Sequence, residues 1–187
     1  GAEQGILKGL YLFKDSKLKA KSRVQMLGSG TILREVIAAA ELLEKDWDVA
    51  ADVWSATSFT ELRRDGLAAE RWNLLHPEDK PRVPFVTQCL QKRAGPVVAA
   101  SDYMKAFADQ IRPFLPGDRI YKVLGTDGFG RSDSRAKLRH FFEVNRTFIA
   151  IAALKALAES GAGKAKTVAE AIKKYGIDPE KPDPTTV

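Results

Sequence analysis

Cysteine and long apolar runs are scarce in this sequence, and each scarcity excludes a class of protein. Its 187 residues include one cysteine, Cys89, so no disulfide can form within the chain, which suits a reducing compartment. No apolar run approaches the roughly 20 residues that cross a bilayer. The first residues, Gly-Ala-Glu-Gln, lack the charged and apolar regions of a secretory signal. We therefore predict a cytoplasmic protein with no membrane partner.

Histidine and the sequence patterns of catalytic nucleophiles are equally scarce. The two histidines, His76 and His140, have neither a cysteine nor a second histidine at metal-ligand spacing. No serine lies in a Gly-x-Ser-x-Gly sequence. Cys89 lies in an apolar series with Val86 and Leu90, which indicates a small buried residue rather than a nucleophile. We therefore predict no catalytic residue and no metal ligand in this chain.

Clusters of one charge are also missing, although the formal net charge is +6. The 30 lysines and arginines alternate with the 24 aspartates and glutamates almost everywhere. Nucleic-acid binding usually needs a clustered basic face. The two densest basic stretches, residues 14–23 and 164–174, are typical of solvated surface. The sequence therefore predicts no nucleic-acid partner.

What the sequence does contain is an alternation of strand and helix patterns along its whole length. Short apolar runs predict strands over residues 23–27, 51–55, 96–100 and 119–124. Helical spacing predicts helices over residues 31–47, 58–75 (with a break or kink near Gly66), 85–91, 102–111, 133–142, 146–159 and 166–175. Residues 1–22 are predicted as an extended N-terminal segment that includes a polar loop, and residues 178–187 as a proline-rich tail. Four strand–helix alternations favour one α/β domain, a three-layer sandwich with helices on both faces of a parallel sheet.

Local signals mark two further features. Ser58 followed by Glu61 is the capping-box signature of a helix start. Trp54 lies in a predicted strand, which favours a place in the core. The sequence does not decide whether Trp47 and Trp72 lie in the core or at a protein interface, a place where tryptophan is enriched.

Two glycine-rich stretches approach nucleotide-binding motifs, and both depart from them. Residues 28–30, Gly-Ser-Gly, follow a predicted strand, but a dinucleotide fingerprint needs a third glycine where this chain has Leu33. Residues 161–164, Gly-Ala-Gly-Lys, lack two parts of a phosphate loop, because Ala158 replaces its first glycine and Ala165 its serine or threonine. We interpret the first stretch as a tight turn and the second as a helix C-terminal cap.

The most distinctive stretch is residues 125–135, which places three glycines, two arginines and two aspartates before a predicted helix. Ser132 or Ser134 can cap that helix, whose N-terminus beside the arginines would suit an anion. The alternative is a well-capped surface turn whose two aspartates accept loop hydrogen bonds rather than act as acid and base. The candidate interface or anion-site residues are Asp127, Phe129, Arg131, Ser132, Asp133 and Arg135.

Several blocks of the sequence together resemble a known family. The longest are Leu27–Arg34, Thr57–Gly66 and Leu124–Phe142, and the same pattern includes Arg71–Pro77 and Ser101–Lys105. These blocks resemble the C-terminal domain of the homodimeric bacterial pyruvate dehydrogenases, which are similar to transketolases. The resemblance extends over essentially the whole chain. It implies a single domain over residues 1–187 with a mixed, mostly parallel sheet, taken from the C-terminal end of a longer chain.

The resemblance implies a support domain rather than a catalytic one. In this family the two preceding domains hold thiamine diphosphate and Mg²⁺, and the C-terminal domain supports the dimer whose interface makes the active sites. The intact enzyme decarboxylates pyruvate and passes the acetyl group to lipoyl groups of the dihydrolipoyl acetyltransferase core. The implied partners are therefore the upstream domains of the same chain, the second subunit of the homodimer and that core.

The residues themselves agree that no cofactor binds here. The family's cofactor signature is Gly-Asp-Gly with an asparagine further along the chain. Here Thr126 precedes Asp127-Gly128, and Asn145 comes too early. We therefore expect this fragment alone to bind neither thiamine diphosphate nor Mg²⁺ and to be inactive.

Two other functions compete with the support domain. One is an anion or regulatory-ligand binding module that uses residues 125–135 and the following helix N-terminus. The other is a free-standing nucleotide-using enzyme, which the missing glycine and phosphate-loop residues disfavour.

Overall fold

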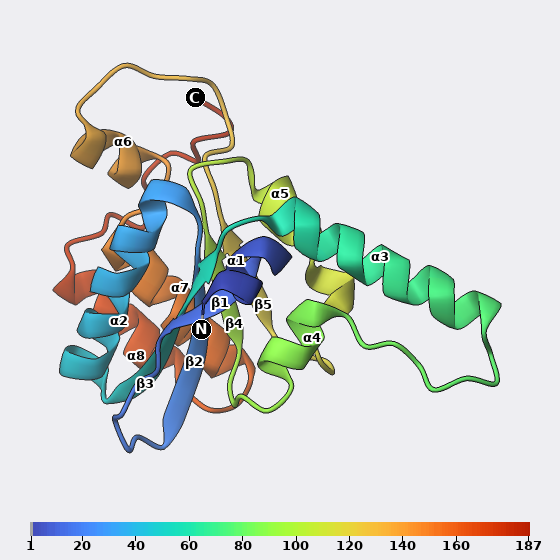
Figure 1. Cartoon of the computed structure of the whole chain (residues 1–187). Coiled ribbons are helices and arrows are strands. Elements are labelled where there is room, and N and C mark those ends of the chain that lie inside the picture. The colour runs from blue at the N-terminus through green and yellow to red at the C-terminus, as the bar shows by residue number, and fades with distance from the viewer. Residues whose placement is uncertain (1) are drawn as a thin grey trace.

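The computed structural model describes residues 2–187 and is built on one sheet of five strands in the order β1-β3-β2-β4-β5 (Figure 1). The strands are β1 (Leu10–Lys14), β2 (Ser22–Gly28), β3 (Val49–Ala56), β4 (Val97–Ala100) and β5 (Tyr121–Leu124). Neighbouring strands from β3 to β5 are parallel, whereas β1 pairs antiparallel with β3 at one edge. The predicted mixed, mostly parallel sheet is confirmed.

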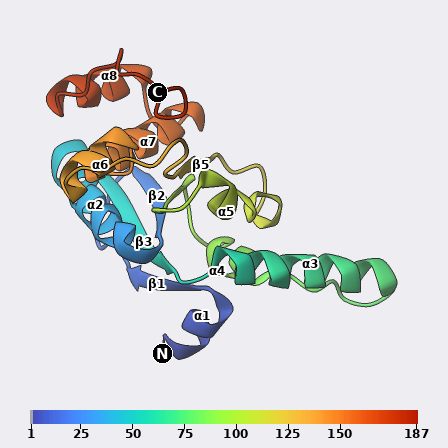
Figure 2. The ribbon, with the colours of Figure 1, turned by 90° about the horizontal axis from the view of Figure 1, so that it is seen from above.

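Helices cover both faces of this sheet, as a three-layer sandwich requires (Figure 2). One face is covered by α2 (Leu33–Trp47) and α7 (Arg146–Glu159), with α8 (Ala165–Lys174) packed on the outside of α7 and α6 (Arg135–Phe141) on the same side. The other face carries α1 (Glu3–Lys8), α3 (Phe59–Leu75), α4 (Phe85–Leu90) and α5 (Lys105–Asp109). Short 3₁₀ turns, η1 (Gly30–Ile32) and η2 (Arg112–Phe114), complete the elements. No helix within residues 2–187 combines the length and apolar character needed to cross a bilayer.

The central strands are buried on both faces, so their alternate residues build two separate cores. In β2, Val24 and Met26 pack under α2 and α7, whereas Leu27 packs into the core on the other side. In β3, Val53 and Trp54 likewise belong to opposite cores. Trp54 is 4% exposed and its Nε1 donates to Gln25 Oε1 at 2.8 Å, which confirms its predicted place in the core.

The N-terminal segment corrects one sequence prediction. Residues 3–8, expected to be extended, form α1, and only residues 10–14 are a strand. Gly9 ends the helix in the left-handed region at φ 95°, where its amide bonds back to the carbonyls of Gly5 and Ile6. A helix of six residues is too short for an apolar periodicity to reveal it.

Two predictions about helices, a break or kink near Gly66 and a helix over residues 102–111, are also wrong. Helix α3 runs unbroken through Gly66, which packs against Phe114: a Cβ at this position would lie 2.5 Å from the aromatic ring. Glycine is therefore present for a close approach rather than for a bend. The helix expected over residues 102–111 is confined to α5, because residues 102–104 form the turn that leaves β4.

Candidate functional site

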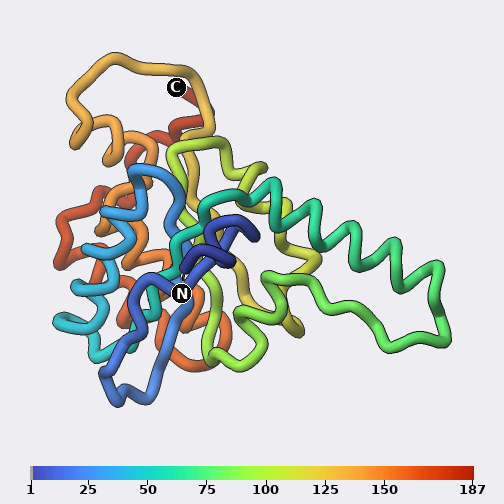
Figure 3. The backbone as a smooth tube through the Cα atoms, in the orientation of Figure 1, coloured from blue at the N-terminus to red at the C-terminus, as the bar shows by residue number. Residues whose placement is uncertain are grey.

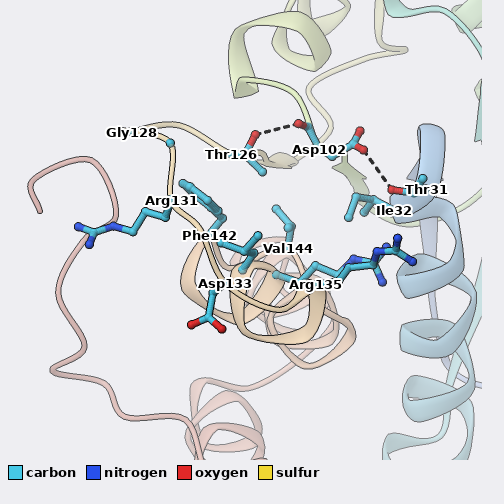
Figure 4. A pocket seen from close by; sticks show the side chains of 13 residues that line it. Thr31, Ile32, Asp102, Thr126, Gly128, Arg131, Asp133, Arg135, Phe142 and Val144 are labelled. Atoms are coloured by element: carbon cyan, nitrogen blue, oxygen red, sulfur yellow. Dashed lines mark hydrogen bonds between the residues drawn. The ribbon is translucent and has the colours of Figure 1, made fainter.

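A cleft of about 640 Å³ opens at the carboxyl ends of β2, β4 and β5 (Figure 4). Thr31 and Ile32 follow β2, Asp102 follows β4, and Thr126 follows β5. In the sheet, β3, which follows β2 in the chain, lies on one side of β2, whereas β4 and β5 lie on its other side. The cleft thus occupies the point where the strand order reverses, the usual place for binding in open α/β sheets.

Asp102 joins the three loops that form the rim of the cleft. Its Oδ2 accepts a hydrogen bond from Thr31 Oγ1 at 3.0 Å, and its main-chain carbonyl accepts one from Thr126 Oγ1 at 2.9 Å (Figure 4). Gly30 has φ 56°, and a Cβ there would lie 3.2 Å from Asp102 Oδ1. The Gly-Ser-Gly stretch is therefore a tight turn against Asp102, as the sequence predicts.

The floor of the cleft is apolar. Ile32 and Val144 are each 1% exposed, and Leu138 and Phe142 line the same space. In Figure 4 the side chains of Phe142 and Val144 lie between those of Arg131 and Arg135. The rim is polar, because Asp102 and Thr126 line it together with three arginines, Arg131, Arg135 and Arg139.

Both aspartates of residues 125–135 are loop hydrogen-bond acceptors, as one interpretation of the sequence predicts. Asp127 Oδ2 accepts from the amide of Lys105 at 3.0 Å, and Asp133 Oδ1 from the amide of Ser134 at 2.6 Å. Ser134, not Ser132, caps α6, because its Oγ accepts from the amide of Lys137 at 3.5 Å. Ser132 itself is exposed.

The two arginines of this loop do not converge on one point. The Arg131 guanidinium carbon lies 4.6 Å from the centroid of the Phe141 ring, whereas the Arg135 side chain extends toward α2 (Figure 4). Phe129 is 75% exposed at the tip of the loop. Of the six predicted residues, only Arg131, Asp133 and Arg135 line the cleft, and the two guanidinium groups do not form a joint anion-binding pair.

The C-terminal tail packs against this loop, a contact that the sequence did not reveal (Figure 3). Gly128 has φ 112°, and a Cβ there would lie 2.3 Å from the carbonyl oxygen of Pro184. Lys181 Nζ donates to the Phe141 carbonyl at 2.8 Å and pairs with Glu143 Oε1 at 3.2 Å. The tail thus supports the loop from outside.

Glu35, which the sequence analysis did not single out, holds the side chain of Arg139, a residue that lines the cleft. Its carboxylate accepts hydrogen bonds at 3.0 Å from Arg139 Nη1 and from the main-chain N and Nε of Arg146, which joins α2 to α6 and α7. Burial acts to raise the pKa of Glu35, but the hydrogen bonds and charge of Arg146, together with the charge of Arg139, hold it below its usual value. The available signal was an acidic residue on the apolar face of a predicted helix.

We expect Glu35→Gln to lower the free energy of unfolding at pH 7 by about 2–3 kcal/mol, because a buried charge-assisted network loses its negative charge. Since folding lowers the pKa of Glu35, its stabilisation is complete above the unfolded-state pKa of about 4.5 and is lost as the pH falls through the folded-state value. Urea unfolding of both proteins at pH 7 and pH 3 measures this. An equal difference between them at both pH values would contradict the assignment.

Other titratable groups add no chemistry to the cleft. Burial raises the pKa of the Cys89 thiol to about 11, so it is protonated at neutral pH. The side chain is only partly buried rather than part of the deep core. Within residues 2–187, no three His, Cys, Asp or Glu side chains gather as metal ligands would.

Comparison with known proteins gives the class to which this fold and cleft belong. A family model described as the transketolase-like TK C-terminal domain matches residues 9–145. A transketolase mutant from Pichia stipitis has a TM-score of 0.56 at 17% identity, over 86% of this chain and 19% of that chain. Transketolase from Campylobacter jejuni has a TM-score of 0.51 at 22% identity, over 79% of this chain and 18% of that chain. The chain belongs to the family of transketolase-like C-terminal domains.

Within this class, curated bacterial proteins named Pyruvate dehydrogenase E1 component are similar to the chain. Identity is 62% over 98% of the chain for Pseudomonas aeruginosa, 59% over 100% for Cupriavidus necator and 54% over 98% for Escherichia coli. The chain covers 21%, 21% and 20% of these relatives, or about a fifth of their length. The resemblance inferred from the sequence is confirmed, and these names give no support to an anion or regulatory-ligand module.

Proposed function

We propose that this chain is the C-terminal support and dimer-interface domain of a thiamine-diphosphate-dependent pyruvate dehydrogenase component. The intact component decarboxylates pyruvate and reductively acetylates lipoyl groups of the dihydrolipoyl acetyltransferase core in the cytoplasm. The observation that carries this proposal is the 62% identity, over 98% of the chain, to the Pyruvate dehydrogenase E1 component of P. aeruginosa. The apolar floor of the cleft fits a supporting role, because apolar groups pack well but supply no acid, base or nucleophile.

The residues of the chain do not fit thiamine diphosphate or Mg²⁺. Asp127 shares with the aspartate of the family's cofactor signature only the glycine that follows it. Its carboxylate already accepts a hydrogen bond from the amide of Lys105. That signature is itself incomplete here, because Thr126 stands where its first glycine would be and Asn145 comes too early. The proposal therefore assigns both cofactors to upstream domains, and the fragment alone is expected to be inactive.

The interface itself is assigned to residues 125–135 and the cleft beside them. Phe129 is 75% exposed, and Tyr103 and Met104, in the loop after β4, are 63% and 51% exposed. Exposed aromatic and methionine side chains beside an apolar cleft are typical of surfaces that a partner covers. In the proposal, a neighbouring domain or the second subunit covers this edge of the sheet.

Phe129→Asp tests this assignment in the longer enzyme that carries the chain. We expect the variant to raise the dimer dissociation constant about tenfold or more, because a buried aromatic contact is lost and a charge is desolvated. Sedimentation equilibrium measures the constant, and pyruvate decarboxylation with added thiamine diphosphate and Mg²⁺ measures activity at the same concentrations. Activity should fall only where the dimer dissociates.

Ala162→Asp is the matched control, because it introduces the same charge at an exposed position of the α7–α8 turn. The control should leave dimerisation and activity unchanged. If Phe129→Asp behaves like Ala162→Asp in both measurements, residues 125–135 are not part of the dimer interface. If the wild-type longer enzyme does not decarboxylate pyruvate, the proposed activity is wrong.

A further inference from the structure

The outer half of α3 and the segment that returns from it project away from the sheet (Figures 1 and 3). We call residues 66–84 the α3 arm. At its base, the amide of Phe85 donates to Asp65 Oδ2 at 2.6 Å, which ties the end of the returning segment to the helix. Beyond Gly66, which packs on Phe114, the arm extends past the core of the domain.

The α3 arm is held in one shape by its own side chains. Trp72 and His76 stack with ring centroids 4.3 Å apart at 7°, and the Arg82 guanidinium carbon lies 4.3 Å from the Trp72 ring. Asn73 Nδ2 donates to the main-chain carbonyl of Arg82 at 3.0 Å, and the Arg82 amide donates to Asn73 Oδ1 at 2.7 Å. Trp72, which the sequence did not assign to core or interface, therefore stabilises the shape of the arm. A braced arm loses little conformational entropy when it binds.

The same arm exposes apolar side chains to solvent. Leu74 is 79% exposed and Leu75 is 56% exposed near its tip, with Leu67 and Val83 at 41% and 42%. Leu67 and Leu74 are seven residues apart and so share one face of the helix. A rigid projection that displays leucines fits insertion against another protein surface.

A second exposed apolar element lies on the same face of the sheet. Helix α1 carries Ile6 and Leu7, which are 48% and 68% exposed. In Figures 1 and 2, α1 and α3 both lie on the face opposite α2 and α7. Ala2, the first residue that the structure describes, is the N-cap of α1 and so lies on this face.

We propose that the face formed by α1 and the α3 arm docks the domain that precedes residue 2 in the longer chain. The inference rests on the proposed function, which makes this chain the C-terminal part of a component about five times its length, since it covers 21% of its relatives. A preceding domain attached through α1 has a high effective concentration at this face, which favours it over a separate protein. This surface is distinct from residues 125–135, so the chain can contact two bodies at once.

Photo-crosslinking in the longer enzyme tests the identity of the occupant. Benzoylphenylalanine replaces Leu74, and in a control Lys166, whose side chain is 84% exposed on α8. Mixed dimers of light and isotope-heavy subunits then separate crosslinks within one chain from crosslinks between chains. We expect position 74 to crosslink to the preceding domain of the same chain, about tenfold above position 166.

Crosslinks to the other subunit, crosslinks to the acyltransferase core, or a yield no higher than at position 166 would each overturn the inference. Leu74→Asp gives a second measurement, because the exposed leucine is not needed for folding of this chain. In the longer enzyme it should speed amide hydrogen exchange in residues 66–84 about tenfold, whereas Lys166→Asp should not. Unchanged exchange contradicts docking. If the longer enzyme decarboxylates pyruvate but shows neither the crosslink from position 74 nor the faster exchange, only the docking inference is wrong. If it shows both but does not decarboxylate pyruvate, only the proposed activity is wrong.

Discussion

Replacing Gly95 with alanine should lower the free energy of unfolding by at least about 3 kcal/mol. Gly95 has φ 90°, which a residue with a Cβ rarely adopts, and that Cβ would lie 1.7 Å from the main-chain oxygen of Arg23. Both obstacles are backbone, so no side chain can rotate to relieve them. The adjacent Pro96 carbonyl accepts the Gln25 amide at 2.9 Å, so any shift disturbs the pairing of β2 with β4. Urea unfolding followed by circular dichroism measures the loss.

Gly117→Ala separates the two causes of this effect. Gly117 also has a positive φ, of 63°, but a Cβ there would meet nothing within 4 Å. It should therefore cost only the conformational strain of about 1 kcal/mol. If the Gly95 and Gly117 variants unfold at the same urea concentration, the backbone overlap at Gly95 is not what makes glycine necessary. A Gly95 variant that is recovered only as insoluble protein, with Gly117→Ala soluble, agrees with the prediction.

The second large effect is expected at Asp52, whose side chain is fully buried in β3. Its carboxylate accepts the Ser16 amide at 3.0 Å and Gln25 Nε2 at 2.9 Å, and it pairs with Arg23. Asp52→Ala leaves the Arg23 charge without its counter-ion and the Ser16 amide without its acceptor, which should lower the free energy of unfolding by about 3–5 kcal/mol. Trp54 fluorescence reports the change directly, because its indole N–H donates to Gln25 in the same network.

Asp118→Ala is the matched control for Asp52, since its carboxylate lies on an exposed turn before β5. Its effect should stay within about 0.5 kcal/mol of zero. Asp52→Asn, which keeps one acceptor oxygen but removes the charge, should fall between the two. An alanine variant at Asp52 as stable as the one at Asp118 would show that the buried network contributes nothing net.

Regular elements were predictable because their signals are local. Apolar runs placed β2, β3, β4 and β5, and Ser58 was correctly predicted as the N-cap of α3, since its Oγ accepts the Glu61 amide at 3.1 Å. The capping box is not complete, because the Ser58 amide donates to the Gly9 carbonyl and not to Glu61. The Gly-Ser-Gly stretch was also correctly predicted as a tight turn, which follows β2 and packs against Asp102. The family resemblance, carried by long blocks of sequence, supplied the antiparallel component of the sheet that alternation alone did not predict.

The sequence by itself therefore determined the fold class, the family and the absence of recognisable catalytic motifs. Only the tertiary structure decided what Gly66 and Glu35 do, since Phe114 and Arg146, which they contact, lie far along the chain. It also decided that the side chains of Arg131 and Arg135 diverge, which weakens the anion site that residues 125–135 suggested. Side-chain direction and long-range contact depend on how elements pack, and spacing along the chain does not encode them locally.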